Sequence, residues 1–198
     1  VGVLGLGAGT LATYGRDGDV YHFYEIDPQV IEYAQGQGGY FSYLDDSAAQ
    51  IEVGLGDARL SLARALRDGG GEGYDLLILD VFSGDAVPVH LLTREAFEVY
   101  LAHLEPGGAL AANISTSHLN MRPLLAILAD RFDLRGVVVE DEGDGAMRYA
   151  SFWVLMARDP AVLVDGASSG DVTELSSFYE PDMKLWTDTY SNLLPLLR

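Results

Sequence analysis

Short apolar runs alternate with helix-like stretches along most of the chain, and this alternation constrains the fold more than any other feature. The strand at Leu76–Leu79 contains only leucine and isoleucine, as expected of a strand covered on both faces. Alternating strands and helices indicate an α/β fold, in which helices cover both faces of a mainly parallel sheet. The seven expected strands are Val1–Gly5, Val20–Ile26, Ile51–Leu55, Leu76–Leu79, Ala109–Ile114, Val137–Val139 and Phe152–Met156.

Helix signals lie between these strands. Asp27 and Pro28 predict the N-cap and the first residue of one helix. Pro106-Gly107-Gly108 is expected to end another helix, and Asn120 to cap a last one that runs to Phe132. The remaining helix signals are a start at Thr10–Tyr14, a helix through Ala58–Leu66, and apolar residues at helical spacing from Leu92 to Leu104.

Seven strands in this arrangement fit a Rossmann-like, class I methyltransferase fold, whose last strand is antiparallel. Ligands of such sheets bind at the carboxyl ends of the strands. The length of 198 residues fits a single domain. We expect residues 1–157 to form the ligand-binding domain and residues 158–198 to be a loop and tail that pack on it. Glycine-rich loops are expected at residues 68–73, 141–145 and 166–171.

Charge and composition exclude several partners. Lysine and arginine total 12 against 30 aspartates and glutamates, a net charge of −18. Nucleic acids and anionic membrane surfaces are therefore not expected as partners, since both require cationic side chains. A cationic small substrate would be attracted by this negative charge, although a well-solvated acidic surface without any such substrate would have the same composition. The chain has no cysteine, which excludes disulfides, thiolate nucleophiles and Cys-ligated zinc.

The histidines give no metal signal. Their spacing is not that of metal ligands, so we expect surface or loop histidines and no metal: His22, His90, His103 and His118. His90 follows the fourth strand and is also a candidate for lining the site.

Targeting signals are also lacking. No apolar run reaches 18 residues, so these residues predict no membrane span. The chain starts without methionine, in an apolar strand at Val1. We therefore expect a piece of a larger protein with an N-terminal part before Val1.

A glycine-rich turn follows the first strand. Gly5, Gly7 and Gly9 allow a tight strand-to-helix turn and a close approach of a ligand to the backbone. A dinucleotide fingerprint would have glycine or alanine where Thr10 stands. The Gly-x-Gly-x-Gly spacing therefore favours an adenosyl sulfonium ligand over NAD.

Carboxylates follow the next two strands. Glu25, together with its neighbour Ile26, is predicted to bind the ribose, because an acidic side chain 20 residues after Gly5 can accept both hydroxyls. Asp57 is predicted to accept the adenine amino group, and the Ala58 amide to donate to a ring nitrogen. A solvated carboxylate is the alternative for Glu25. A helix N-cap is the alternative for Asp57, and it is compatible with adenine binding.

The fourth strand ends at Asp80, where a carboxylate faces the reactive end of a ligand held by the first three loops. A buried aspartate that caps the next loop is the alternative. Asp85 follows five residues later, in a loop with glycine and proline. Asn113 and Ser115, at the end of the fifth strand, are candidates for substrate contact or for strand-end capping.

These motifs together resemble the spermidine synthase (polyamine aminopropyltransferase) family over roughly residues 1–157. The resemblance rests on Gly-x-Gly-x-Gly, Tyr-Glu-Ile-Asp, Gly-Asp-Ala, Tyr-Asp-Leu-Leu-Ile-Leu-Asp, Leu-Leu-Thr-Arg-Glu-Ala-Phe and Leu-Glu-Pro-Gly-Gly. Residues 80–93 and the tail from Trp186 to Pro195 look most like a bacterial branch, in which this domain often follows a multi-helix membrane region.

The resemblance implies transfer of an aminopropyl group from decarboxylated S-adenosylmethionine to putrescine. Glu25 would hold the ribose, Asp57 and Ala58 the adenine, and Asp80 would orient and deprotonate the attacking amine. Putrescine-type synthases carry two more aspartates, and here Ala8 and Ser83 stand in those places. Ser83, Asp85 and Asn113 are therefore the predicted substrate contacts. The family's N-terminal hairpin, which covers the nucleoside, is absent from this sequence.

The leading hypothesis is an alkyl (aminopropyl) transferase that uses S-adenosylmethionine or its decarboxylated form on a small amine, in the cytoplasm. One alternative is an S-adenosylmethionine-dependent methyltransferase of unknown acceptor. The other is a non-catalytic nucleoside-binding module of a membrane protein. A homodimer is compatible with each.

Overall fold

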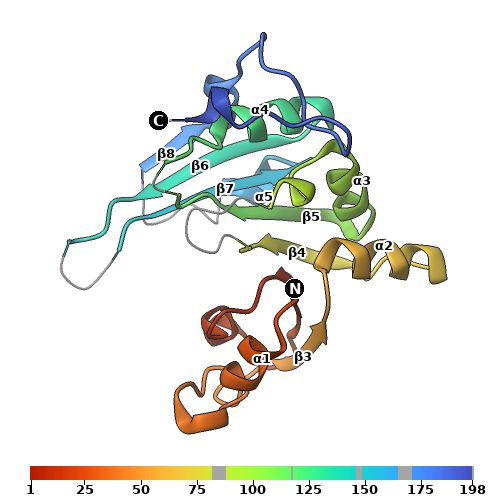
Figure 1. Cartoon of the computed structure of the whole chain (residues 1–198), viewed down its shortest axis with the longest axis vertical. Coiled ribbons are helices and arrows are strands. Elements are labelled where there is room, and N and C mark those ends of the chain that lie inside the picture. Colours follow the sequence, from red (N-terminus) through yellow and green to blue (C-terminus); the bar gives the residue numbers. More distant parts are fainter. Residues whose placement is uncertain (82–87, 117, 146–148, 165–170, 198) are drawn as a thin grey trace.

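A computed structural model describes residues 1–81, 88–116, 118–145, 149–164 and 171–197. Figure 1 shows one eight-stranded sheet that runs from β3 at the bottom to β8 at the top. The strands are β1 Gly2–Leu4, β2 Val20–Glu25, β3 Gln50–Leu55, β4 Tyr74–Leu79, β5 Leu104–Asn113, β6 Arg135–Asp141, β7 Ser151–Ala157 and β8 Asp171–Glu174. The α-helices are α1 Pro28–Ala34, α2 Ala58–Asp68, α3 Arg94–Ala102, α4 Arg122–Arg131 and α5 Ala161–Val164. Short 3-10 helices are η1 Thr10–Tyr14, η2 Gln37–Gly39, η3 Val89–Leu91, η4 Leu175–Phe178 and η5 Leu194–Leu196.

The strand order is β3-β2-β1-β4-β5-β7-β6-β8. Each neighbouring pair from β3 to β5 is parallel, whereas β7 is antiparallel to both β5 and β6. This confirms the Rossmann-like, class I methyltransferase fold. The order reverses next to β1, and the carboxyl ends of β1 and β4 lie side by side there, where open α/β sheets bind ligands.

The sheet has one strand more than the seven expected. β8 pairs antiparallel with β6 and begins at Asp171, a residue predicted to be in a loop. No strand signal is visible in these four residues, because Val172 is the single large apolar residue among them and it is itself exposed. Pairing to the free edge of β6 places this strand, rather than a hydrophobic pattern of its own.

One predicted helix end is wrong. The helix expected to end at Pro106-Gly107-Gly108 stops at Ala102, and those three residues lie in β5. The chain enters the sheet early, because the Tyr74 N–H donates to the carbonyl of His103, and a register shift after Tyr74 takes up the extra residues.

Capping signals had a mixed outcome. The N-cap of α4 is Met121 rather than Asn120, although the Asn120 side chain still accepts the Arg122 N–H. Asp27 caps α1 as predicted, with Pro28 as the first residue. The Thr10–Tyr14 signal forms a short 3-10 helix rather than the start of a longer helix.

Apolar side chains of the central strands alternate between two faces. Val3 and Ile78 pack with Phe23 on one face, and Leu4 and Leu77 belong to the larger cluster on the other. Because both faces are buried, the central strands read as continuous apolar runs.

The C-terminal segment, residues 179–197, joins the larger cluster. Trp186 is 1% exposed and Leu196 is fully buried within it. Figure 1 shows this segment, in dark blue, beside α3 and α4, and the Arg94 N–H donates to the carbonyl of Trp186. Within the described ranges, no helix combines the length and apolar character that crossing a membrane requires.

Candidate functional site

A cavity of about 570 Å³ opens at the carboxyl ends of β1 to β4. The predicted site residues Gly5, Gly7, Glu25, Ile26, Asp57, Ala58 and Asp80 line it. The other lining residues are Leu6, Tyr24, Asp27, Val30, Gly56, Val81, Pro88, His90 and Leu91. Residues from four separate loops thus meet in one hollow. Ser83 and Asp85 lie outside the described residues.

The glycine loop shapes one wall of this cavity. Gly5 has φ +94°, and a Cβ there would lie 2.1 Å from the carbonyl oxygen of Asp80. Only glycine allows β1 to pass β4 this closely. Gly7 has φ +54° and open space where a Cβ would be, so its backbone is accessible from the cavity. Gly9 instead packs near Leu44 and is not a lining residue.

Glu25 is held by three backbone amides. One carboxylate oxygen accepts from the N–H groups of Ile26 and Asp27, at 2.8 and 3.0 Å, and the other from Leu6 at 3.1 Å. The side chain therefore ties the glycine loop to the end of β2. A carboxylate offers about four lone-pair positions, so one remains for a ligand donor.

Asp57 has two partners. Oδ1 accepts the Leu60 N–H at 2.8 Å and so caps α2, as its alternative reading predicts. Oδ2 lies 3.0 Å from Nε2 of His90, and this side chain of Asp57 is 19% exposed. An adenine amino group would have to share Oδ2 with His90. Ala58, the next residue, is buried, and its position at the first turn of α2 leaves its N–H outside the helical pattern.

Asp80 is oriented from its neighbouring strand. Its Oδ1 accepts a hydrogen bond from Nδ2 of Asn113 at 2.9 Å, and Oδ1 of Asn113 accepts the Ser115 N–H at 2.9 Å. The backbone contact therefore sets which way the amide of Asn113 points. Asn113 is not a lining residue, so it reaches the cavity through Asp80. Among the described residues, no ion pair involves Asp80.

Tyr24 lines the cavity and is itself buried. Its hydroxyl lies 2.8 Å from that of Tyr74 and 3.2 Å from Nδ1 of His22. Burial raises the pKa of Tyr24 to about 12. The phenol therefore stays neutral at physiological pH and offers no charge to a ligand.

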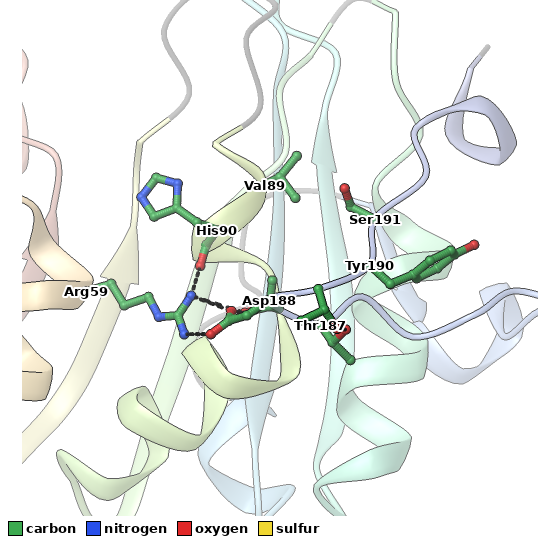
Figure 2. A pocket seen from close by; sticks show the side chains of 9 residues that line it. Arg59, Val89, His90, Thr187, Asp188, Tyr190 and Ser191 are labelled. Carbon is green, nitrogen blue, oxygen red and sulfur yellow. Dashed lines mark hydrogen bonds and ion pairs between the residues drawn. The ribbon is translucent and has the colours of Figure 1, made fainter.

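A second hollow of about 680 Å³ adjoins the first and shares His90 with it (Figure 2). Its lining residues are Arg59, Val89, His90, Thr93, Thr187, Asp188, Thr189, Tyr190 and Ser191. The C-terminal segment forms one wall, where Asp188 points toward Arg59 and contacts it directly.

Arg59 is a further residue near the site that was not predicted from the sequence. The signal was its position directly after Asp57 and Ala58, on the first turn of a helix that approaches the site. Its guanidinium forms a two-bond ion pair with Asp188, which lies 129 residues further along the chain. That hydrogen-bonded guanidinium lowers the pKa of Asp188. In the part of the chain that the structure describes, no group of three or more acidic, histidine or cysteine side chains could hold a metal ion.

Comparison with curated proteins supports the resemblance stated on the motifs. No protein-family model matches the chain. It is 38% identical over 96 residues to a polyamine aminopropyltransferase of Vibrio vulnificus, which covers 48% of this chain and 30% of that protein. It is 29% identical over 119 residues to a probable polyamine aminopropyl transferase of Bifidobacterium longum, covering 57% and 23%. An N-terminal histidine N-methyltransferase of Emericella nidulans is 36% identical over 115 residues, covering 56% and 19%. The chain thus spans less than a third of the length of these relatives.

Solved structures share the fold. A probable spermidine synthase from Corynebacterium glutamicum superposes with a TM-score of 0.67 at 20% identity, covering 97% of this chain and 73% of that one. Human methyltransferase-like protein 13, solved in complex with SAH, gives 0.60 at 18% identity, covering 96% and 85%. A spermidine synthase in complex with the transition state analogue AdoDATO gives 0.51 at 14% identity, covering 94% and 59%.

Fold and cavity define a protein of the Rossmann-like, class I methyltransferase fold. Within that class, the chain is similar to polyamine aminopropyltransferases, that is, to spermidine synthases.

Proposed function

We propose that this chain is a spermidine synthase-like transferase domain that transfers an alkyl group, aminopropyl in the leading case, from an adenosyl sulfonium donor to a small amine. The observation that carries the proposal is the cavity in which Asp80, oriented by Asn113, shares one space with Glu25 and Asp57. Two of these carboxylates are positioned to bind a nucleoside, and the third lies next to its reactive end.

The nucleoside part depends on charged acceptors. The remaining lone pair of Glu25 accepts from the ribose, and Asp57 accepts from the adenine amino group. The glycine-loop backbone at Gly7 approaches the donor's sulfonium side. Hydrogen bonds to charged groups contribute roughly 1.5–3 kcal/mol each, which is enough to select a nucleoside.

The chemical step forms a carbon–nitrogen bond and breaks a carbon–sulfur bond. The amine lone pair attacks the carbon beside the sulfonium, and the electrons of the breaking bond go to sulfur, which leaves as a neutral thioether. The new ammonium loses its proton to Asp80. Free alkylamines have a pKa of about 10, and a carboxylate beside the amine can take this one proton as the carbon–nitrogen bond forms. The same negative charge stabilises the sulfonium and the amine in close proximity.

A methyltransferase is the second candidate, and Ala8 favours it. A carboxylate at this position would pair with the ammonium of a decarboxylated donor, and alanine cannot. The similarity to a histidine N-methyltransferase over 56% of the chain supports the same alternative. The donor's identity therefore separates the two candidates.

The test is calorimetry of the protein with S-adenosylmethionine, decarboxylated S-adenosylmethionine and methylthioadenosine, followed by mass spectrometry of reactions with putrescine. Addition of an aminopropyl group supports the leading proposal. Addition of a methyl group to an acceptor, from S-adenosylmethionine alone, supports the second candidate. Binding of a nucleoside with no turnover on any amine favours the non-catalytic module, and absence of nucleoside binding contradicts all three.

A further inference from the structure

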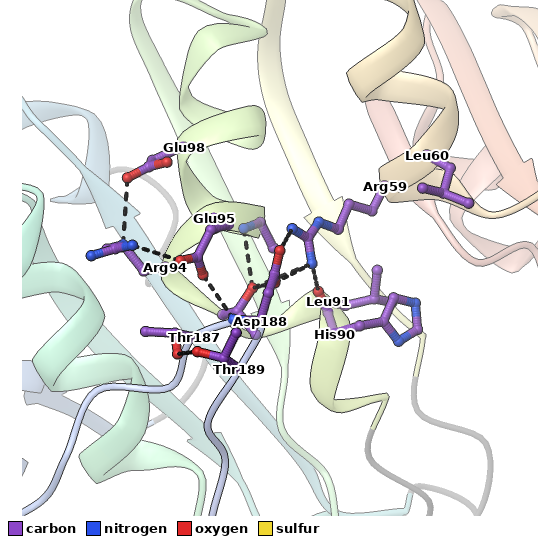
Figure 3. Close-up of polar contacts among 12 residues, drawn as sticks. Arg59, Leu60, His90, Leu91, Arg94, Glu95, Glu98, Thr187, Asp188 and Thr189 are labelled. Atoms are coloured by element: carbon purple, nitrogen blue, oxygen red, sulfur yellow. Dashed lines mark hydrogen bonds and ion pairs between the residues drawn. The ribbon is translucent and has the colours of Figure 1, made fainter.

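The C-terminal segment reaches the predicted nucleoside site through a chain of polar contacts. Figure 3 shows the first two, from Asp188 to Arg59 and from Arg59 to the backbone of His90. Asp188 contacts Arg59, Arg59 contacts the backbone of His90, and the His90 ring contacts Asp57. The last residue is the predicted adenine acceptor. A residue near the end of the chain is thus connected to the site by three consecutive contacts.

The contact between Asp188 and Arg59 has good geometry. The two guanidinium nitrogens lie 2.7 and 2.6 Å from the two carboxylate oxygens, which is a bidentate pair. Thr93 donates a further hydrogen bond to Asp188 at 2.9 Å, and the Asp188 N–H donates to Glu95 at 3.0 Å. The side chain of Arg59 is 15% exposed and that of Asp188 is 45% exposed. The pair therefore lies at the edge of the protein, with the cation on the inner side.

Arg59 also binds the loop that leads to the site. Its NH1 donates to the carbonyl of His90 at 2.7 Å, and Nε2 of His90 lies 3.0 Å from Oδ2 of Asp57. Arg59 and Asp57 flank Ala58 at the start of α2. The guanidinium also donates to Oγ1 of Thr93, but at 3.4 Å this contact is longer than either bond to Asp188. Loss of Asp188 therefore weakens the anchor that η3 and the first turn of α2 share.

We propose that Asp188 is a positioning residue for nucleoside binding: the docked C-terminal segment holds Arg59, and through it His90 and Asp57, in the geometry that the nucleoside needs. The inference rests on the proposed function, since it assigns a nucleoside to this cavity. Coupling between two binding events is reciprocal, so a bound nucleoside also holds the segment in place. If the contact between the segment and α3 were only structural, it would stabilise the fold, but nucleoside binding and segment docking would not affect each other.

The chain offers a direct probe of the segment, because Lys184 is its single lysine. Lys184 is exposed and lies over the ring of Tyr190, at 5.7 Å. A lysine-specific protease needs several residues in extended form around the bond. When opening is fast, the cleavage rate reports the population in which the segment is released. One cut at one site thus measures docking.

The experiment compares wild type with Asp188→Asn and with Arg59→Lys, which keeps the charge but loses the planar fork. Glu98→Gln is the matched control. It breaks the Arg94–Glu98 ion pair on α3, and Glu98 has no hydrogen bond or ion pair with Arg59 or His90. Methylthioadenosine affinity is measured by calorimetry, and cleavage at Lys184 is followed with and without saturating methylthioadenosine.

Both Asp188→Asn and Arg59→Lys should weaken methylthioadenosine binding about five- to tenfold, the lower range of site-to-site coupling, because solvent screens the half-exposed pair. In wild type the nucleoside should slow cleavage by a similar factor, and in both variants that protection should shrink. Glu98→Gln should match wild type in both measurements.

Faster cleavage in Asp188→Asn with unchanged nucleoside affinity would overturn the inference and show that Asp188 only stabilises the docked segment. So would wild-type cleavage that is unaffected by saturating nucleoside. If Glu25→Ala loses binding while Asp188→Asn keeps it, the inference alone fails. If wild type binds no nucleoside, the proposed function fails and the inference fails with it. Thermal unfolding of each variant checks that the fold is retained, and Arg59→Lys still tests the inference if Asp188→Asn does not fold.

Discussion

At the scale of single residues, Asp80 is the group on which the proposed chemistry depends. Asp80→Asn keeps the shape and the contact with Asn113 but removes the charge that accepts a proton. We expect turnover with an amine to fall about 10²–10⁴-fold. Nucleoside affinity should change much less, because Asp80 is not among the predicted nucleoside contacts. Steady-state rates and calorimetry check both.

Asp75→Asn is the matched control for that experiment. Asp75 is exposed and lies in the same strand, β4, near its other end. The Asp75→Asn substitution should leave turnover unchanged. Full activity in Asp80→Asn would rule out Asp80 as the proton acceptor and favour the methyltransferase or the non-catalytic module.

Glu25 has a structural task beside its predicted ribose contact. Glu25→Ala removes an acceptor for three backbone amides, so the glycine loop loses its tie to β2. We expect methylthioadenosine affinity to fall tenfold or more, about 1.4 kcal/mol per decade. The free energy of unfolding should fall as well, by about 1–3 kcal/mol, since amides lose a charged partner. Calorimetry and urea unfolding measure the two effects.

Glu32→Ala, on the exposed side of α1, serves as the control and should change neither quantity. Unchanged nucleoside affinity in Glu25→Ala would remove the ribose assignment, whatever happens to stability.

At the scale of elements, the close approach of the chain just after β1 to the chain just after β4 positions the cavity. Gly5→Ala places a Cβ 2.1 Å from a carbonyl oxygen, at a φ of +94°. Neither atom can move without shifting a central strand, so we expect a loss of at least about 2–4 kcal/mol in unfolding free energy. Gly7→Ala has a φ of +54° and open space, so strain of about 1 kcal/mol is expected there. Urea unfolding of the two variants compares them, and equal losses would contradict this account of the close approach at Gly5.

At the scale of the whole molecule, the ion pair of Arg59 and Asp188 makes docking of the C-terminal segment depend on pH. The pKa of Asp188 is lowered from its usual value of 3.8, chiefly by the hydrogen bond from Arg59. A carboxylate whose pKa is lowered on folding stabilises the fold above its unfolded pKa, and this contribution is lost as the pH falls through the folded pKa. The contribution is small, about 1 kcal/mol or less, because Asp188 is 45% exposed.

Wild type and Asp188→Asn should therefore differ in unfolding free energy at pH 7 and converge below pH 3.8, which urea unfolding at several pH values can measure. A difference that persists unchanged in acid would show that the carboxylate charge is not what holds the segment.

Features encoded by neighbouring residues could be predicted from the sequence. The parallel core of the sheet follows from apolar runs such as Leu76–Leu79, and the N-cap at Asp27 from the proline that follows it. The cavity-lining positions of Glu25, Asp57 and Asp80 follow from a general rule, because parallel strands bring their carboxyl ends to one edge. Local order along the chain was sufficient in each case.

Features that depend on partners distant in sequence were not predictable. β8 exists through pairing with β6, and β5 starts early because Tyr74 binds the His103 carbonyl. Arg59 and Asp188 are 129 residues apart, and each reads as an ordinary surface charge in its own segment. Side-chain direction and long-range proximity are settled when the chain packs, since no local pattern encodes which distant carboxylate an arginine meets.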